Sequence, residues 1–215
     1  MDADLSALRR DYAAGGLDEP DLSPDPFDMF ARWYDDAVTA EIHEPNAMVV
    51  ATATPDGVPS ARFVLLKGFS SGGFVFYTNQ SGRKGRELAA NPHIALLFPW
   101  HPLERQVRVE GTAAAVTREE VKAYFSQRPR GSQLGAWASH QSEPVESREA
   151  LDAAYREVEQ RFEGVEDIEP PDEWGGYRVT PTRFEFWQGR TGRLHDRFVY
   201  DLRDNSQWEH QRLAP

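Results

Sequence analysis

The spacing of hydrophobic positions predicts two helices near the N-terminus, followed by a series of strands. Residues 4–14 have helical spacing, and a second helix is expected over about 26–40, where Asp25 precedes Pro26 as an N-cap and large apolar residues follow at helical intervals. From residue 47 the pattern changes to short alternating runs, AMVVATAT, ARFVLLK and FVFYTN, which are separated by turn-forming residues. These runs predict consecutive antiparallel strands.

The rest of the chain alternates between short helices and strands. Thr117 and Glu120 form a capping box, which predicts a helix that continues to about residue 127. The other expected elements are helices over 82–90, 132–138 and 147–163, and strands over 93–99, 104–116, 177–188, 193–203 and 207–213. Six or seven strands with interspersed helices predict a mainly β fold with α additions, in the α+β class: an antiparallel barrel with peripheral helices.

The composition is typical of a soluble globular protein. Of the 215 residues, 40% are hydrophobic and 27% are charged, which suits one large domain. We expect residues 1–25, a helix and a connector rich in Pro and Asp, to be an appendage of a single domain over 26–215. The chain shows no export signal and no run of 18 apolar residues, so we expect a cytoplasmic protein without a membrane span.

Charge is distributed unevenly along the chain. The formal net charge is −11, which disfavours nucleic acid as a partner because the whole molecule would repel a polyanion. Residues 62–130 nevertheless contain eleven Lys or Arg against five Asp or Glu. A basic region inside an acidic protein favours a small anionic ligand.

Several common functional motifs are absent. The chain has no GxGxxG, no GxxxxGK[ST] and no GxSxG, and with no cysteine it has neither a disulfide nor a cysteine nucleophile. His43 and Glu44 begin like a zinc-protease motif, but Ala47 stands where the second histidine would be. We therefore expect no metal site.

The segment RLHDR, residues 193–197, carries the first candidate chemistry. In a regular strand the side chains of Arg193, His195 and Arg197 would share one face. Phe186 and Trp187, just before this segment, add planar surfaces suited to an aromatic anion. The alternatives are a solvated edge strand for the charged segment and ordinary core positions for the two aromatic residues.

Two further basic clusters are typical of phosphate binding. Arg83 and Lys84 begin a helix directly after the strand FVFYTN, so cations and free backbone N–H groups could meet one phosphate. Tyr124, Arg128 and Ser132 form a second set, at the end of one helix and the start of the next. The alternative interpretation of each cluster is a group of polar residues exposed to solvent at a helix end. Two separate phosphate sites would imply two phosphorylated ligands.

Arg62 and Lys67 lie five positions apart in the run RFVLLK. This separation places them on opposite faces of a regular strand. Either a bulge intervenes or the two residues serve different partners.

A series of longer motifs extends over nearly the whole chain: LRRDYAAGGL (8–17), RFVLLKGF (62–69), FYTN (76–79), GRKGREL (82–88), LLFPWHPLERQVRVEG (96–111), YFSQRPRGSQLGAWAS (124–139) with QS (141–142), WGGYRV (174–179), FWQGRTGRLHDR (186–197) and the terminal RLAP. In these motifs and in their order the sequence resembles the pyridoxine/pyridoxamine 5′-phosphate oxidase family. The resemblance implies an FMN-binding split β-barrel and a homodimer with two active sites built from both chains.

The resemblance also implies roles for individual residues. Arg193 and His195 would face the substrate ring as catalytic residues, and Arg9 and Tyr12 would close over the substrate. The residues that would hold FMN are Arg62, Lys67, Tyr77, Thr78, Arg83, Lys84, Gln106, Gln141, Ser142, Trp187 and Arg197. The residues that would bind the substrate are Arg9, Tyr12, Lys67, Tyr124, Arg128, Ser132, Arg193 and His195.

The implied reaction is the oxidation of pyridoxamine or pyridoxine 5′-phosphate by O2 to pyridoxal 5′-phosphate, with release of H2O2 and, from the amine, NH3. Two alternatives remain: a deazaflavin-dependent reductase on the same fold, and a non-catalytic flavin or pyridoxal phosphate carrier. The sequence departs from the family at Gly82, where serine is common, which we expect to weaken FMN binding modestly. A second departure, Gly131, leaves Arg128 and Ser132 in place.

Overall fold

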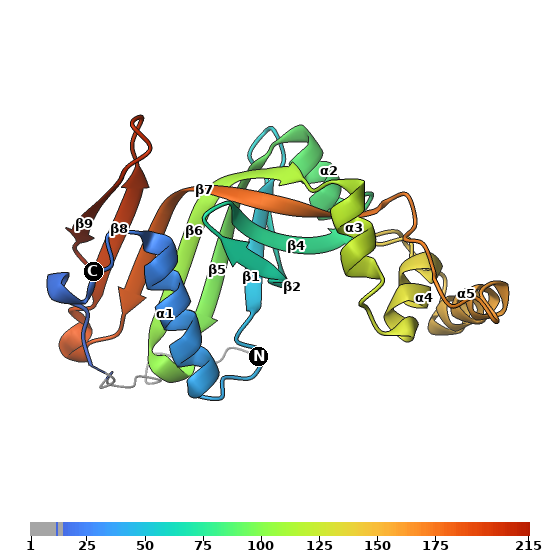
Figure 1. The fold of residues 1–215 in the computed structure, drawn as a ribbon, viewed down its shortest axis with the longest axis horizontal. Helices are drawn as coiled ribbons and strands as arrows, with labels where there is room; N and C mark the ends of the chain where they lie inside the picture. The colour runs from blue at the N-terminus through green and yellow to red at the C-terminus, as the bar shows by residue number, and fades with distance from the viewer. Residues whose placement is uncertain (1–11, 13–14) are drawn as a thin grey trace, which may run out of the picture. The chain divides into compact units, whose positions relative to one another are not determined.

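The computed structural model describes Tyr12 and residues 15–215. The helix expected over 4–14 lies outside these residues except for Tyr12, and so does Arg9. Within the described part of the chain, nine strands form one hydrogen-bonded sheet (Figure 1). The strands are β1 (Ala47–Ala53), β2 (Pro59–Leu65), β3 (Gly68–Ser70), β4 (Gly73–Asn79), β5 (His93–Trp100), β6 (Arg105–Ala115), β7 (Trp174–Gln188), β8 (Asp196–Leu202) and β9 (Trp208–Leu213).

The strands follow the order β2-β1-β5-β6-β7-β4-β3, and β8 and β9 extend the sheet from β7. The pairs β3–β4, β4–β7, β7–β8 and β8–β9 are antiparallel. The helices are α1 (Pro26–Thr39), α2 (Arg83–Ala90), α3 (Arg118–Phe125), α4 (Arg130–Ala138) and α5 (Arg148–Arg161), with 3-10 turns over Glu19–Asp21, His101–Leu103 and Thr191–Arg193. The predicted α+β class is confirmed, with nine strands instead of six or seven.

The chain divides into two compact units, and each is described by itself. The terminal unit comprises the described residues up to Val49 together with Ala95–Glu110 and Pro181–Pro215. The central unit comprises Val50–Ile94 and Gly111–Thr180. Strands β1, β5, β6 and β7 each continue from one unit into the other.

In the terminal unit, helix α1 covers aromatic residues of the sheet. The carboxylate of Asp25 accepts a hydrogen bond from the backbone N–H of Phe27 at 2.8 Å, so the predicted N-cap is confirmed. Phe27 packs against Phe184 with ring centroids 5.2 Å apart, and Trp33 packs against Phe186 at 5.3 Å. Phe186 is fully buried in this core, as its alternative interpretation proposed.

In the central unit, helices α3 and α4 close over a core next to the sheet. This core contains Val121, Phe125, Leu134, Ile168 and Trp174. Thr117 and Glu120 form the expected capping box of α3, which ends at Phe125, two residues earlier than expected. Helices α4 and α5 lie side by side (Figure 1). Strand β4 pairs with the start of β7, so that Asn79 faces Trp174 across the ladder. These elements position the candidate site.

The strand expected over 193–203 begins only at Asp196, so this prediction is wrong at its start. Residues 191–193 form a 3-10 turn in which Gly192 and Arg193 both have φ near +63°. This left-handed backbone ends the extended conformation, and side chains no longer alternate between two faces. Arg193 and His195 precede the strand that carries Arg197, and the three do not share a strand face.

Candidate active site

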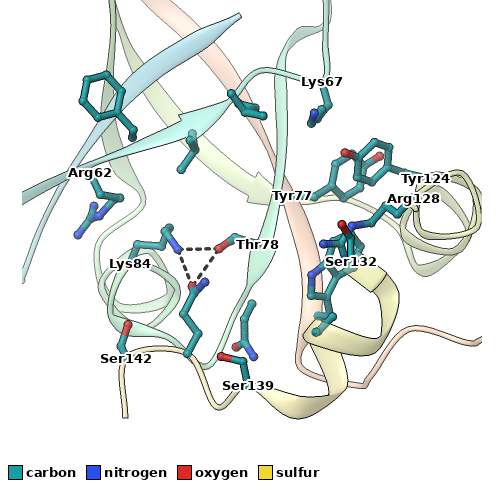
Figure 2. Close-up of a pocket in the computed structure, with 18 of the residues that line it drawn as sticks. Arg62, Lys67, Tyr77, Thr78, Lys84, Tyr124, Arg128, Ser132, Ser139 and Ser142 are labelled. Carbon is teal, nitrogen blue, oxygen red and sulfur yellow. Dashed lines mark hydrogen bonds between the residues drawn. The ribbon is translucent and has the colours of Figure 1, made fainter. Parts of the chain in front are cut away.

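A cavity of about 1130 Å³ lies in the central unit (Figure 2). It collects residues from β2, β4, α2 and α3, from the segment between α3 and α4, and from α4 and the residues after it. Eleven of the predicted site residues line it: Arg62, Lys67, Tyr77, Thr78, Arg83, Lys84, Tyr124, Arg128, Ser132, Gln141 and Ser142. In Figure 2, Arg62, Lys84 and Ser142 lie on one side of the segment with Tyr77 and Thr78, and Tyr124, Arg128 and Ser132 lie on the other.

Lys84 is the most buried of the three cations on the Arg62 side of the cavity, which are Arg62, Arg83 and Lys84. Its side chain extends from the N-terminal turn of α2, and the residue is 8% exposed. Its Nζ donates hydrogen bonds to Oγ1 of Thr78 and Oε1 of Gln141, both at 2.6 Å (Figure 2). Burial and the nearby charge of Arg62 lower the pKa of Lys84 to about 8. An anionic ligand in the cavity would supply the counter-charge that this ammonium lacks.

The N-terminus of α2 has a hydroxyl cap that comes from a distant segment. Gly82 occupies the N-cap position and has no side chain to offer, but the backbone N–H of Arg83 donates to Oγ of Ser142 at 3.2 Å. A Cβ atom at Gly82 would lie 2.8 Å from Oε1 of Gln141. At Gly82, where the family commonly has serine, the hydroxyl of Ser142 therefore contacts the helix end, and the absence of a Cβ allows Gln141 to approach closely.

Three parallel aromatic rings form the second side of the cavity. Tyr77 stacks on Tyr124 with ring centroids 4.1 Å apart and on Trp174 at 5.7 Å. The guanidinium of Arg128 lies 4.7 Å from the centre of the Trp174 ring, an arrangement that holds a cation in place without a carboxylate. A Cβ atom at Gly176 would lie 2.6 Å from the Tyr77 ring, so this glycine allows the ring to lie against β7.

Two residues that line this cavity each have a buried side-chain nitrogen without a hydrogen-bond partner among the described residues. These atoms are Nη1 of Arg128 and Nδ2 of Asn79. Oδ1 of Asn79 accepts hydrogen bonds from the backbone N–H of Ser81 at 2.8 Å and from its hydroxyl at 2.6 Å, which fixes the orientation of the amide. Buried donors normally have partners, so both atoms are unusual for the interior of a folded protein.

The position of Lys67 resolves the question of opposite strand faces. Strand β2 ends at Leu65, so Lys67 lies beyond the regular strand and lines the same cavity as Arg62. Its Nζ is 5.9 Å from the centre of the Tyr124 ring. Lys67 is therefore close to the aromatic side of the cavity (Figure 2).

The remaining described site residues belong to the terminal unit. Tyr12, Trp187 and His195 form a cluster, with ring centroids 5.7 Å apart for Tyr12 and Trp187, 5.3 Å for Tyr12 and His195, and 4.7 Å for Trp187 and His195. Nδ1 of His195 accepts a hydrogen bond from the backbone N–H of Arg190 at 3.1 Å. In a neutral imidazole this bond places the proton on Nε2, which is then the donor available to a ligand.

Arg197, Arg193 and Gln106 differ in how firmly they are held. Nε of Arg197 donates to Oε1 of Glu185 at 2.9 Å, and Glu185 is almost completely buried. Arg193 is exposed at the end of its 3-10 turn, and Gln106 is half-buried in β6. Arg197 is thus held by the fold itself, whereas Arg193 has a more open position.

The sequence interpretation missed several residues of the cavity, among them Asn79, Gln127, Ser139 and Trp174. Trp174 begins the quoted motif WGGYRV, and the two glycines after it were a signal for a close backbone approach. Asn79 ends the motif FYTN, but nothing in a single sequence distinguishes an unpartnered amide from an ordinary strand end.

Two family models match the chain. Residues 34–162 match pyridoxamine 5′-phosphate oxidase, and residues 174–215 match the pyridoxine 5′-phosphate oxidase C-terminal dimerisation region. The chain belongs to the pyridoxine/pyridoxamine 5′-phosphate oxidase family. As a member of this family it is an enzyme, an oxidoreductase.

Relatives match this family member over almost their whole length. The pyridoxine/pyridoxamine 5′-phosphate oxidase of Rubrobacter xylanophilus is 61% identical over 212 residues, which cover 99% of this chain and 97% of the relative. That of a Nocardioides species is 58% identical, with coverage of 99% and 98%.

Solved structures confirm the predicted split β-barrel. PhzG from Burkholderia lata, in complex with tetrahydrophenazine-1-carboxylic acid, matches 91% of this chain and 95% of its own with a TM-score of 0.85 and 33% identity. An FMN-binding protein from Nostoc punctiforme, related to pyridoxamine 5′-phosphate oxidase, has a TM-score of 0.71 at 15% identity, with coverage of 90% and 100%; at this identity the likeness concerns the fold alone. Among the described residues, no helix combines the length and apolar content needed to cross a bilayer.

Proposed function

We propose that this enzyme uses FMN to oxidise pyridoxamine 5′-phosphate and pyridoxine 5′-phosphate to pyridoxal 5′-phosphate, a reaction of vitamin B6 metabolism. The observation that carries the proposal is the presence of two cationic groups in one cavity: Arg62, Arg83 and Lys84 in the first, and Lys67 and Arg128 in the second. Two phosphorylated ligands, a cofactor and a substrate, account for both groups.

The residues of the first group fit the phosphate of FMN. Lys84 has only neutral oxygens as partners, and Arg83 lies at the N-terminus of α2, where backbone N–H groups favour an anion. Thr78, Gln141 and Ser142 line the cavity beside them. We assign Tyr77, Gln106, Trp187 and Arg197 to the same cofactor on the basis of the family motifs.

The second group fits the phosphate of the substrate. Nη1 of Arg128 is a buried donor without a partner in the described chain, and Tyr124, whose ring stacks on Tyr77, lines the same side of the cavity. Lys67 adds a second positive charge and Ser132 a hydroxyl. Together these groups would bind a phosphate dianion in the ground state and throughout the reaction.

When bound, FMN supplies the two-electron redox chemistry by which the amine or alcohol carbon is oxidised and O2 is reduced to H2O2. The protein binds and orients the cofactor and the substrate. Arg193 would stabilise the phenolate oxygen of the substrate ring, and His195 would donate a hydrogen bond from Nε2 and hold a proton near the reacting carbon. Tyr12, which contacts His195, would help to cover the ring, and Arg9 would act with it.

We further propose that the protein acts in the cytoplasm as a homodimer whose two active sites contain residues of both subunits. The match of residues 174–215 to a dimerisation region supports this assembly. Light scattering should give about twice the mass of the 24.4 kDa chain. A monomer that binds FMN fully would contradict it.

The deciding experiment is an absorption spectrum of the purified protein. We expect a yellow protein that is bleached by pyridoxamine 5′-phosphate without oxygen and releases peroxide when air is admitted. A protein that binds FMN but is not bleached would be a carrier. A protein that binds a deazaflavin in preference to FMN would be the alternative reductase.

A further inference from the structure

Glu87 is a buried carboxylate that the proposed site does not use. It lies in α2 and is 5% exposed. Its oxygens accept hydrogen bonds from four side chains: Thr52, Ser60 at 2.5 Å, Arg62 at 3.4 Å and Arg83 at 2.8 Å. Burial raises the pKa of Glu87, but the hydrogen bonds from Ser60, Thr52 and Arg83 outweigh it and lower the pKa to about 2. The carboxylate is therefore charged at neutral pH.

Two hydroxyl groups connect this carboxylate to Arg62. Thr52 and Ser60 each donate their single hydroxyl proton to Oε2 of Glu87, so only oxygen lone pairs face the guanidinium. Nη1 of Arg62 donates to Oγ1 of Thr52 at 2.6 Å and to the backbone oxygen of Val50 at 3.3 Å. Nη2 donates to Ser60 and Glu87. With both Nη groups occupied, Nε is the donor that Arg62 can offer to a ligand.

Arg83 is held by the other oxygen of the same carboxylate. Its Nε donates to Oε1 of Glu87 at 2.8 Å, an i,i+4 pair along α2. A bond at Nε fixes the plane of the guanidinium and leaves both Nη groups without a partner in the described chain. The Arg83 side chain is 55% exposed and lines the cavity together with Arg62.

We propose that Glu87 is a positioning residue for phosphate recognition. Glu87 accepts a hydrogen bond from Nε of Arg83, and it orients the hydroxyls of Thr52 and Ser60, which accept hydrogen bonds from the Nη groups of Arg62. In this way it determines which guanidinium N–H groups remain for the ligand. The two Nη groups of Arg83 then suit a bidentate contact with phosphate, and Arg62 adds one donor and a charge. The inference rests on the proposed FMN site and names the residue that arranges it.

The test is Glu87→Gln, which keeps the shape of the side chain. An amide places an N–H2 group where the carboxylate has an acceptor, so it faces either Arg83 or the two hydroxyls donor to donor. The dissociation constant for FMN, measured by flavin fluorescence, should rise about 10-fold, the effect of one charge-assisted hydrogen bond. Riboflavin, which lacks the phosphate, should change less than about twofold. Glu157→Gln, the same charge change at an exposed position of α5, is the matched control.

A double-mutant cycle separates positioning from a general structural role. In an Arg83→Ala background, the effect of Glu87→Gln on FMN binding should be smaller, because one of the residues through which Glu87 acts is already gone. Ser60→Ala provides a milder variant in case Glu87→Gln does not fold. It removes one hydroxyl link, leaves the carboxylate paired with both arginines, and should weaken FMN binding about threefold without an effect on riboflavin.

Three outcomes would overturn the inference. FMN binding by Glu87→Gln or Ser60→Ala that is as tight as in the wild type, or tighter, would limit Glu87 to stability. Equal losses of affinity for FMN and for riboflavin would lead to the same conclusion. A wild type that does not distinguish FMN from riboflavin would instead refute the phosphate site of the proposed function.

Discussion

The affinity for FMN is expected to fall as the pH rises above about 8, and Lys84 is the reason. In the cavity this ammonium has two neutral oxygens as partners, and burial together with the charge of Arg62 lowers its pKa from 10.5 to about 8. A lysine in contact with a phosphate dianion keeps its proton. Binding of FMN to the deprotonated form therefore requires the uptake of one proton.

The difference between pKa values of 10.5 and about 8 corresponds to about 3 kcal/mol by which the cavity disfavours the charged ammonium. The phosphate of FMN does not titrate in this range, because the second pKa of a phosphate monoester is about 6. If the bound phosphate restores the pKa of Lys84, the dissociation constant should be nearly constant below pH 7.5. It should rise about 10-fold between pH 7 and pH 9.

The assay is a titration of cofactor-free protein with FMN at constant ionic strength, from pH 6.5 to pH 9.5. Lys84→Met should bind FMN more weakly at pH 7, and its affinity should no longer depend on pH. Lys84→Arg should keep the positive charge over the whole range, so its affinity should also be independent of pH. Riboflavin provides the control without phosphate. An undiminished slope in Lys84→Met would assign the titration to another group and refute the reasoning.

The same linkage has the opposite sign for the stability of the cofactor-free protein. The pKa of Lys84 is lower in the folded than in the unfolded state, so the unfolded state binds more protons between about pH 8 and pH 10.5. The contribution of Lys84 to the free energy of unfolding should therefore rise with pH across this window. Lys84→Met should lack this contribution.

Three further predictions concern other parts of the molecule. Arg128→Ala should raise the KM for pyridoxamine 5′-phosphate with near-normal FMN content, whereas Arg193→Ala should lower kcat; steady-state kinetics with phosphorylated and unphosphorylated substrate separate the two. The family motif alone leads to the expectation that serine at position 82 favours FMN, but the structure leads us to expect the reverse. Ser142 already offers a hydroxyl at this helix end, and the Cβ of Gly82→Ser would displace the Gln141 amide from Lys84, so this variant should weaken FMN binding roughly threefold to tenfold in a fluorescence titration; tighter binding would contradict this. Asp196→Asn should lower the free energy of unfolding by about 1–3 kcal/mol in urea titrations, and the difference from wild type should shrink as the pH falls through the lowered pKa of Asp196.

Asp196 illustrates what the sequence did not reveal. In a regular strand, Asp196 would lie on the face opposite Arg193, His195 and Arg197, and this alternation alone indicates no role for it. In the structure it is 5% exposed and accepts hydrogen bonds from the backbone N–H of Leu17 at 2.9 Å, from Arg190 and from Arg212 at 2.6 Å. Two of these partners, at the far ends of the chain, are not visible in local sequence patterns. The segment itself was misassigned because the left-handed backbone at Arg193 is not specified by its residue type.

Elements with local signals were predicted well. Helix α1 has its N-cap at Asp25, and α3 has its capping box at Thr117 and Glu120, since both signals depend on residues within one turn. The site was harder: eleven predicted residues meet in one cavity, but only five of them, Arg83, Lys84, Tyr124, Arg128 and Ser132, belong to the clusters at helix ends that predicted phosphate binding, and the other assignments came from family motifs. Glu87 looked like an ordinary charged helix residue because Thr52 and Ser60 precede it by 35 and 27 positions.

The two sides of the cavity stabilise their arginine side chains by different contacts. Around Arg62 the positive charge is offset by a buried carboxylate, Glu87. Arg128 instead lies over the Trp174 ring, and its pKa is lowered by burial, so its charge is compensated mainly when a ligand arrives. A phosphate on the Arg128 side therefore meets a guanidinium without a carboxylate partner, whereas a phosphate beside Arg62 meets donors that Glu87 already orients, with Lys84 as the cation that lacks a counter-charge. The first arrangement suits a cofactor that stays bound, and the second suits a substrate that must enter and leave at each turnover.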